Sequence, residues 1–263
     1  MAGIRKFGIV AAIVAGLAGI IGAGNPVQAE PLTIAAAHSL KTPFDEILPL
    51  FENEYGTTVR VIYGPSQTLR RQIEKGAPID VFLPEAIEEI EKLYKKGLTL
   101  NGGPRIYAQT SLVLVTSTDS SALSISLTDA LPNRATRIAL GDPKTSAMGE
   151  TTARALTKFA PAYRNRPHLV HAQHSEELVN LVHTGKADVA LVYRVDAINN
   201  GQLRIIDETP SGTYMPVQFG HAVVSTCRDT SLRAAEEFAD FIMSSRIQKL
   251  LLKYGFDSVP SNG

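Results

Sequence analysis

From residue 32 onward, short runs of apolar and β-branched residues alternate with longer segments whose apolar residues recur every three or four positions. Residues 32–36 form the first short run, and Phe44, Ile47, Leu48 and Phe51 then follow at the spacing of one helix face. Runs of the first kind are typical of strands, and segments of the second kind are typical of amphipathic helices. The repeated order of strand and helix indicates parallel sheets covered by helices.

The same pattern places the individual elements. It predicts strands at residues 32–36, 59–63, 80–83, 111–116, 137–140, 169–172, 189–193, 203–206 and 217–224. It predicts helices at residues 44–55, 66–75, 84–96, 126–131, 150–159, 175–183, 231–243 and 245–254.

The elements fall into two blocks without a Pro- or Ser-rich linker, so we predict an α/β protein with two lobes, each a mostly parallel sheet covered by helices. We assign residues 30–112 to the first part of lobe 1, residues 113–220 to lobe 2 and residues 221–263 to the return into lobe 1. The strands at 111–116 and 217–224 are expected to cross between the lobes. Ligands of open α/β sheets bind where strand ends meet helix N-termini, which predicts a ligand in the interlobe cleft.

The N-terminal segment, residues 1–29, has a different composition. Arg5 and Lys6 precede residues 7–24, which carry no charge and are rich in Ala, Gly, Ile and Val. Residues 25–29 break this run and end with the small-residue pattern of a cleavage site. The layout is typical of a secretory signal peptide and predicts a periplasmic or otherwise extracytoplasmic protein. A retained membrane anchor is the alternative, because the apolar run is about long enough to span a bilayer.

Charge and cysteine content narrow the function classes. Lys and Arg number 26, as do Asp and Glu, so the chain lacks the basic excess that a general nucleic-acid binder needs. The single cysteine, Cys227, excludes an internal disulfide and a Cys-rich metal site. It follows an apolar run, and we interpret it as a buried, inert thiol.

Candidate chemistry gathers at four junctions between a predicted strand and the next helix: residues 36–39, 64–68, 141–149 and 174–177. Each junction offers free backbone N–H groups at a helix start, and most add a hydroxyl. Ordinary N-capping explains any one of them, since Ser and Thr are preferred caps. Four such junctions in one chain favour an anion cradle.

Patterns for catalysis and metal binding are weaker. The chain contains no H-E-x-x-H, no G-x-S-x-G and no Walker A loop. His168, His171 and His174 are spaced by three, but the first two fall on a predicted strand, where this spacing points side chains to opposite faces. We therefore predict no metal ion held directly by side chains.

Several segments resemble the periplasmic molybdate-binding proteins of ABC transporters. These are residues 36–40 (Ala-Ala-His-Ser-Leu), 66–82, 141–143 (Gly-Asp-Pro), 192–197 and 253–256, in the same order as in that family. The resemblance covers essentially the whole chain after residue 29, and its most specific part is the Gln-Ile-Glu-x-Gly-Ala-Pro-x-Asp stretch within 66–82. It implies a non-enzymatic, two-lobed periplasmic-binding-protein fold that selects molybdate and tungstate.

The resemblance also implies a ligand site. Ser39 and Ser66 match two serines that give hydroxyl and backbone N–H groups to the oxyanion, Met148 and Ser175 match backbone N–H donors, and Tyr193 matches a tyrosine whose hydroxyl reaches the anion. The metal atom enters as an oxyanion. Departures from the family pattern affect pocket size and selectivity: His38, Pro65, Gln67, the bulk of Met148, and Arg194.

These observations lead to one expected function. The protein captures molybdate or tungstate outside the cytoplasm and delivers it to an ABC permease and its ATPase, as a monomer without cofactor, nucleic acid or catalysis. One alternative is a binding protein for another oxyanion such as sulfate, and a weaker one is an exported hydrolase-type enzyme. The five matched positions supply hydrogen-bond donors and no carboxylate, which favours ligand capture over catalysis. Phosphate keeps a proton that these donors cannot accept, so we expect it to bind most weakly.

Overall fold

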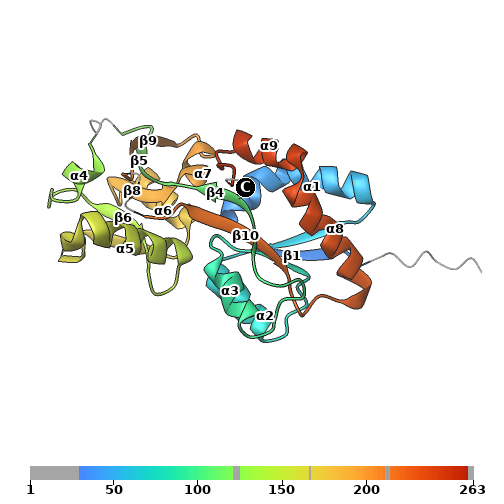
Figure 1. Cartoon of the computed structure of the whole chain (residues 1–263). Helices are drawn as coiled ribbons and strands as arrows, with labels where there is room; N and C mark the ends of the chain where they lie inside the picture. Colours follow the sequence, from blue (N-terminus) through green and yellow to red (C-terminus); the bar gives the residue numbers. More distant parts are fainter. Residues whose placement is uncertain (1–29, 121–124, 166, 211, 213, 260–263) are drawn as a thin grey trace, which may run out of the picture.

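The protein consists of two five-stranded sheets covered by helices, as a computed structural model of the chain shows (Figure 1). The structure describes residues 30–120, 125–165, 167–210, 212 and 214–259. The predicted signal peptide, residues 1–29, lies outside the described residues. Within the described part of the chain, no helix has the length and apolar character needed to cross a membrane.

The first sheet has the strand order β2-β1-β3-β10-β4. Its strands are β1 (Leu32–Ala36), β2 (Val59–Tyr63), β3 (Val81–Leu83), β4 (Arg105–Thr110) and β10 (Val217–Val223). β1 pairs in parallel with β2 and β3, whereas β10 is antiparallel to both β3 and β4. Every strand of this sheet except β10 therefore runs in one direction.

The second sheet repeats this plan in the order β7-β6-β8-β5-β9. Its strands are β5 (Leu112–Ser117), β6 (Ile138–Gly141), β7 (Leu169–Ala172), β8 (Val189–Tyr193) and β9 (Leu203–Glu208). β6 is parallel to β7 and β8, and β5 is antiparallel to β8 and β9. The predicted α/β fold with two lobes of mostly parallel strands is confirmed.

The chain passes between the sheets twice. β4 ends at Thr110 in the first sheet and β5 begins at Leu112 in the second, so the first passage takes place at Ser111. The second passage lies between β9 and β10. Figure 1 shows β4 and β10 running between the half that contains α4, α5 and α6 and the half that contains α1, α2 and α8.

Helices cover both sheets. Those that follow first-sheet strands or pack beside them are α1 (Lys41–Tyr55), α2 (Ser66–Glu74), α3 (Glu88–Tyr94), α8 (Leu232–Met243) and α9 (Ser245–Lys253). Those of the second lobe are α4 (Leu127–Ala130), α5 (Ala147–Phe159), α6 (Ser175–His183) and α7 (Arg194–Ile198). Three 3₁₀ helices complete the set: η1 (His38–Leu40), η2 (Pro161–Asn165) and η3 (Asp229–Ser231).

The C-terminal helices are held on the first lobe by aromatic packing. The ring of Phe238 on α8 meets those of Phe44 and Phe51 on α1 edge to face, at centroid distances of 6.2 and 5.1 Å. Edge-to-face pairs at this distance add to the free energy of area burial. The apolar faces predicted from helical spacing are therefore the faces that pack.

The structure differs from the sequence prediction in two missed elements and in the starts of several helices. β4 was not predicted, because its sequence Arg-Ile-Tyr-Ala-Gln-Thr mixes polar and apolar residues, as suits the edge position it occupies in the sheet. α3 begins at Glu88 rather than at residue 84, and α5 begins at Ala147 rather than at residue 150. The short α7 was also not predicted.

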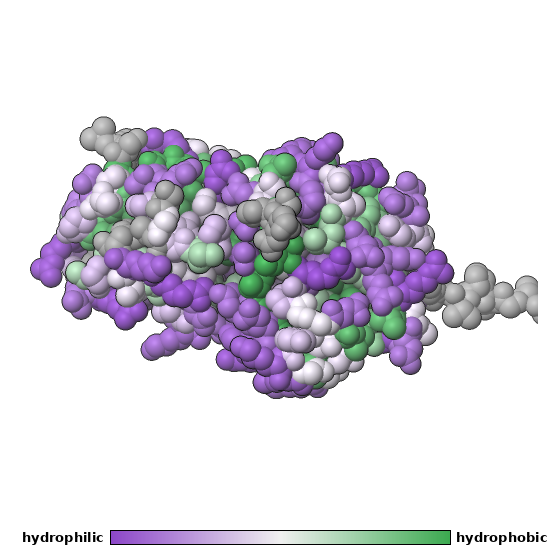
Figure 2. Space-filling view, in the orientation of Figure 1, coloured by the Kyte–Doolittle hydropathy of each residue, from purple (hydrophilic) through white to green (hydrophobic). Residues whose placement is uncertain are grey.

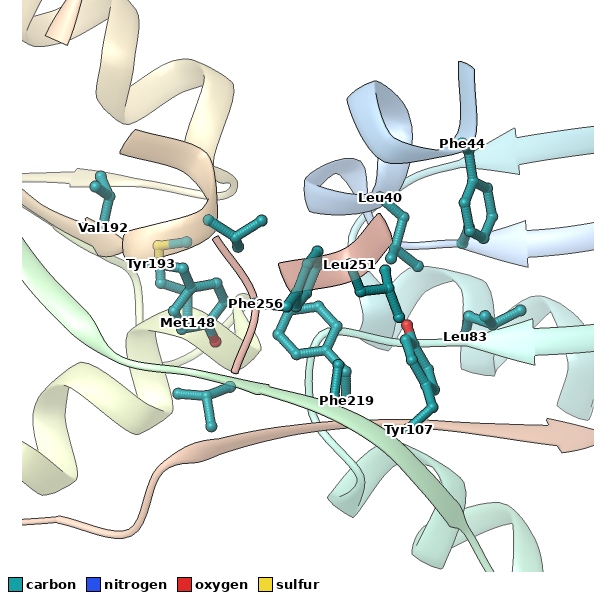
Figure 3. Close-up of a cluster of buried hydrophobic side chains, with 14 of the residues drawn as sticks. Leu40, Phe44, Leu83, Tyr107, Met148, Val192, Tyr193, Phe219, Leu251 and Phe256 are labelled. Atoms are coloured by element: carbon teal, nitrogen blue, oxygen red, sulfur yellow. The ribbon is translucent and has the colours of Figure 1, made fainter. Parts of the chain in front are cut away.

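A continuous apolar cluster joins the two lobes. Figure 3 shows Met148 and Tyr193 on the second-lobe side, Leu40 on the first-lobe side, and Phe219 and Phe256 between them. The Phe219 ring lies 6.1 Å from that of Tyr193 and 5.1 Å from that of Phe256. On the face in view, polar residues cover most of the surface, and apolar residues show in several smaller patches, one of them near the middle (Figure 2).

Candidate functional site: a donor set between the lobes

Two of the candidate residues lie at strand ends of the first lobe. Ser39 is in η1, directly after β1, and Ser66 is the first residue of α2, after β2. Both residues are buried, and their backbone N–H groups have no hydrogen-bond partner among the described residues. Ser39 Oγ is sealed from solvent and also unpartnered, whereas Ser66 Oγ accepts from the Glu85 amide at 3.0 Å. The hydroxyl proton of Ser66 remains available to a ligand.

The third candidate, Met148, is the second residue of α5. The helix is capped by Ser146, whose Oγ accepts from the Gly149 amide at 3.3 Å. The Met148 amide has no partner within the part of the chain that the structure describes. A Cβ added to Gly149 would lie 2.3 Å from the carbonyl carbon of Asp142, so only glycine allows the loop before α5 to approach the helix this closely. This approach sets the position of the Met148 amide.

Ser175 and Tyr193 come from the other two second-lobe junctions. Ser175 begins α6, where the His174 imidazole caps the helix by accepting from the Glu177 amide at 3.4 Å. The Ser175 amide, like the previous three, has no partner in the described ranges. Tyr193 ends β8, its side chain is fully buried and its hydroxyl is unpartnered. Burial raises the pKa of Tyr193 well above its ordinary value, and the nearby Glu85 and Asp196 raise it further.

The structure brings these residues to the facing edges of the two lobes. Ser39 and Ser175 line one pocket of about 310 Å³, together with Asp196. The hydroxyl of Ser66 accepts a hydrogen bond from the backbone amide of Glu85, and the charge of Glu85 raises the pKa of Tyr193. Met148 lies beside Tyr193 in Figure 3. The hydroxyl of Thr151, one turn further along α5, partly lowers the pKa of Tyr193. Residues of all four predicted junctions therefore lie along the facing edges of the two lobes, where His38 stacks on His174 and Gln67 donates to Glu150.

Sequence reasoning missed two carboxyl groups at this site. Glu85, two residues after the end of β3, is buried, and burial together with the charge of Asp196 raises its pKa to about 8. Asp196 lies in α7 with its Oδ2 sealed from solvent and unpartnered. Burial raises the pKa of Asp196 to about 7, although interaction with the Ser39 and Ser175 hydroxyls lowers it in part. The strand-end rule that selected the serines also applies to Glu85.

Contacts across the cleft hold the lobes together. The rings of His38 and His174 stack with centroids 5.1 Å apart. Lys41 Nζ lies 3.7 Å from a carboxylate oxygen of Glu176, which adds an ion pair beside the stacked rings.

Two further pairs join the lobes. Gln67 Nε2 donates to Glu150 at 3.3 Å, and Arg154 donates to Glu88 at 3.0 Å. The two lobes are thus in contact beside the junctions that hold Ser39 and Ser175, and also beside those that hold Ser66 and Met148.

Two other sequence interpretations can be compared with the structure. In the described ranges, no three or more His, Cys, Asp or Glu side chains are grouped so that they could hold a metal ion. Cys227 is only partly buried, which corrects the prediction of a buried thiol. Burial nevertheless raises the pKa of Cys227 to about 12, so the thiol stays protonated at neutral pH and is a poor nucleophile.

Two lobes of one topology, with unpartnered donors on their facing edges, are the arrangement of a protein that binds a small solute. The chain belongs to the family of bacterial extracellular solute-binding proteins, which it matches over residues 32–257. Members of that family bind solutes rather than transform them.

Known proteins similar to this chain span nearly its whole length. It is 28% identical over 227 residues to a putative ABC transporter substrate-binding lipoprotein of Bacillus subtilis, covering 86% of this chain and 85% of the relative. It is 27% identical over 240 residues to a molybdate-binding protein of Escherichia coli, covering 89% and 92%. Among solved structures, the substrate-binding domain of a putative molybdenum ABC transporter from Clostridium difficile is 28% identical, with a TM-score of 0.68 and coverage of 87% and 99%.

Proposed function

We propose that this protein captures a tetrahedral oxyanion, molybdate or tungstate, outside the cytoplasm and delivers it to an ABC permease and its ATPase. In this proposal residues 1–29 are a signal peptide, the protein is a monomer, and no step is catalytic. Residues 30–112 and 221–263 form one lobe and residues 113–220 the other, and the lobes close around the ligand.

The unpartnered donors carry this proposal. The amides of Ser39, Ser66, Met148 and Ser175 and the Tyr193 hydroxyl come from both lobes and lack partners in the described structure. A buried donor without an acceptor costs about 1–3 kcal/mol, so a site with several such donors favours a ligand that accepts from all of them. A tetrahedral oxyanion offers acceptor oxygens in every direction. The similarity to molybdate-binding proteins supports molybdate within this class, and tungstate is included as an oxyanion of the same shape and charge.

Sulfate is the nearest competitor, because it offers the same acceptors on a smaller ion. It would meet the same donors at longer distances, and longer hydrogen bonds are weaker. Phosphate keeps a proton near neutral pH, and this proton finds no acceptor among the five donor positions. We therefore expect molybdate and tungstate to bind most tightly, sulfate less tightly and phosphate least.

Thermal shift and titration calorimetry test the proposal. A ligand that binds only the native state stabilises it by about 2.7 kcal/mol at a hundred times its Kd, so molybdate and tungstate should raise the Tm at millimolar concentration. Sodium chloride at matched ionic strength is the control. If neither ion raises the Tm, the assignment is refuted. If sulfate has a lower Kd than molybdate, sulfate is the ligand instead.

A further inference from the structure

Two carboxyl residues, one in each lobe, lie next to members of the donor set. Glu85 follows β3 in the first lobe, and its backbone amide donates to Ser66 Oγ. Asp196 lies in α7 of the second lobe and lines the pocket that also contains Ser39 and Ser175. The two carboxyl groups are linked electrostatically: the charge of Asp196 raises the pKa of Glu85, and the charges of both raise the pKa of Tyr193.

Neither carboxyl has a cationic partner in the part of the chain that the structure describes. The titratable groups around them are His38, Lys41, Glu176 and His183 in the pocket, and Tyr193 beside it. Lys41, the one fixed cation among these, is paired with Glu176 at 3.7 Å. Asp196 Oδ2 makes no hydrogen bond of normal geometry, although it is sealed from solvent.

An ionised carboxylate in this position conflicts with a bound dianion. Like charges that share a site, shielded from water, disfavour ionisation of the weaker acid. Burial already holds the pKa of Asp196 at about 7 and that of Glu85 at about 8. A bound dianion raises both further, whereas a protonated carboxyl offers an O–H group that donates to the anion.

We propose that oxyanion capture takes up protons, because Asp196 and Glu85 bind the anion as neutral carboxylic acids and contribute donors to the site. This inference rests on the proposed function and adds to it a pH-dependent affinity. The five donor positions predicted from sequence are then completed by two acids, one from each lobe.

The sign of the pH effect follows from proton linkage. A carboxyl that is ionised in the free protein and protonated in the complex makes binding weaker as the pH rises through its free pKa. For each proton taken up, Kd increases about tenfold per pH unit. Below about pH 6 both carboxyls of the free protein are protonated, and Kd for molybdate becomes independent of their titration. Protonation of His38 does not mimic this effect at pH 8, because burial lowers the pKa of His38 below its ordinary value.

Titration calorimetry with molybdate at pH 8, in two buffers of different ionisation enthalpy, measures proton uptake directly. We expect the full chain to take up roughly one proton or more per anion, and Kd to rise between pH 7 and pH 9. Asp196→Asn removes one titrating group while keeping an N–H donor. At pH 9 this variant should bind molybdate more tightly than the wild type, by about tenfold or more. Asp240→Asn, an exposed carboxylate paired with Arg105, is the matched control and should leave proton uptake unchanged.

The outcomes separate this inference from the proposed function. Molybdate binding with no proton uptake at pH 8 and a constant Kd from pH 6 to 9 would overturn the inference and leave the function standing. Phosphate binding that exceeds molybdate binding, and that is lost in Asp196→Asn, would also overturn it, because the carboxylate would then be an ionised acceptor. Absence of molybdate binding at every pH would instead refute the function. The wild-type buffer comparison decides the inference even if the variant fails to fold.

Discussion

Replacement of Tyr193 by phenylalanine separates ligand binding from stability. The Tyr193 hydroxyl is fully buried and has no hydrogen-bond partner among the described residues, as suits a donor to the anion. A hydrogen bond to a charged group is worth about 1.5–3 kcal/mol. Tyr193→Phe should therefore weaken molybdate binding by roughly ten- to 150-fold.

The same change should leave the ligand-free protein as stable as the wild type or more stable. Phenylalanine keeps the ring against Phe219 and removes a buried polar atom that costs about 1–3 kcal/mol when it has no partner. Calorimetric titration gives the affinity, and urea denaturation without ligand gives the free energy of unfolding. A loss of affinity together with equal or higher stability would distinguish a ligand donor from a packing residue.

Tyr107 provides a matched control in the same molecule. Its ring is also fully buried, its hydroxyl is also unpartnered, and burial alone raises its pKa well above the ordinary value. The charges of Glu85 and Asp196 do not contribute to the pKa of Tyr107, in contrast to that of Tyr193, so Tyr107 serves as a buried tyrosine outside the donor set. Tyr107→Phe should change stability in the same direction and leave Kd for molybdate unchanged. Unaltered affinity in Tyr193→Phe, or equal losses in both variants, would refute the proposed role of the Tyr193 hydroxyl.

Two other predictions concern the donors and the response to acid. Ser39→Ala and Ser66→Ala should each weaken molybdate binding by about 1.5–3 kcal/mol. Met148→Ala should weaken it much less, because the donor at this position is the backbone amide. Equal losses of affinity for Met148→Ala and Ser39→Ala in titration calorimetry would contradict this. Burial lowers the pKa of His221 to about 4, so the unfolded chain binds more protons between pH 6.5 and 4 and stability should fall by about 3 kcal/mol as the pH drops through this window. Denaturation at pH 7 and pH 4 should show this loss, and a His221→Gln variant with an undiminished loss would show that another group is responsible.

The elements that were predicted correctly are those with a strong local signal. The run at Leu32–Ala36 is buried along its whole length, and the helix-spaced Phe44, Ile47 and Phe51 of α1 form its buried face. β4 lacked such a signal, because an edge strand with mixed polarity has neither an unbroken apolar run nor a strict alternation. Its assignment required the neighbouring β10, which is more than a hundred positions away in the sequence.

The donor positions are a local property, whereas the acids at the site are not. Ser39, Ser66 and Ser175 stand where a strand gives way to a helix, so their free amides follow from the order of the elements alone. Whether they face one another depends on how the two sheets are joined at Ser111 and after β9. The same packing buries Glu85 beside Asp196 and so raises the pKa of both carboxyls. Desolvation and charge depend on distances between residues far apart in the chain, and only the tertiary structure sets those distances.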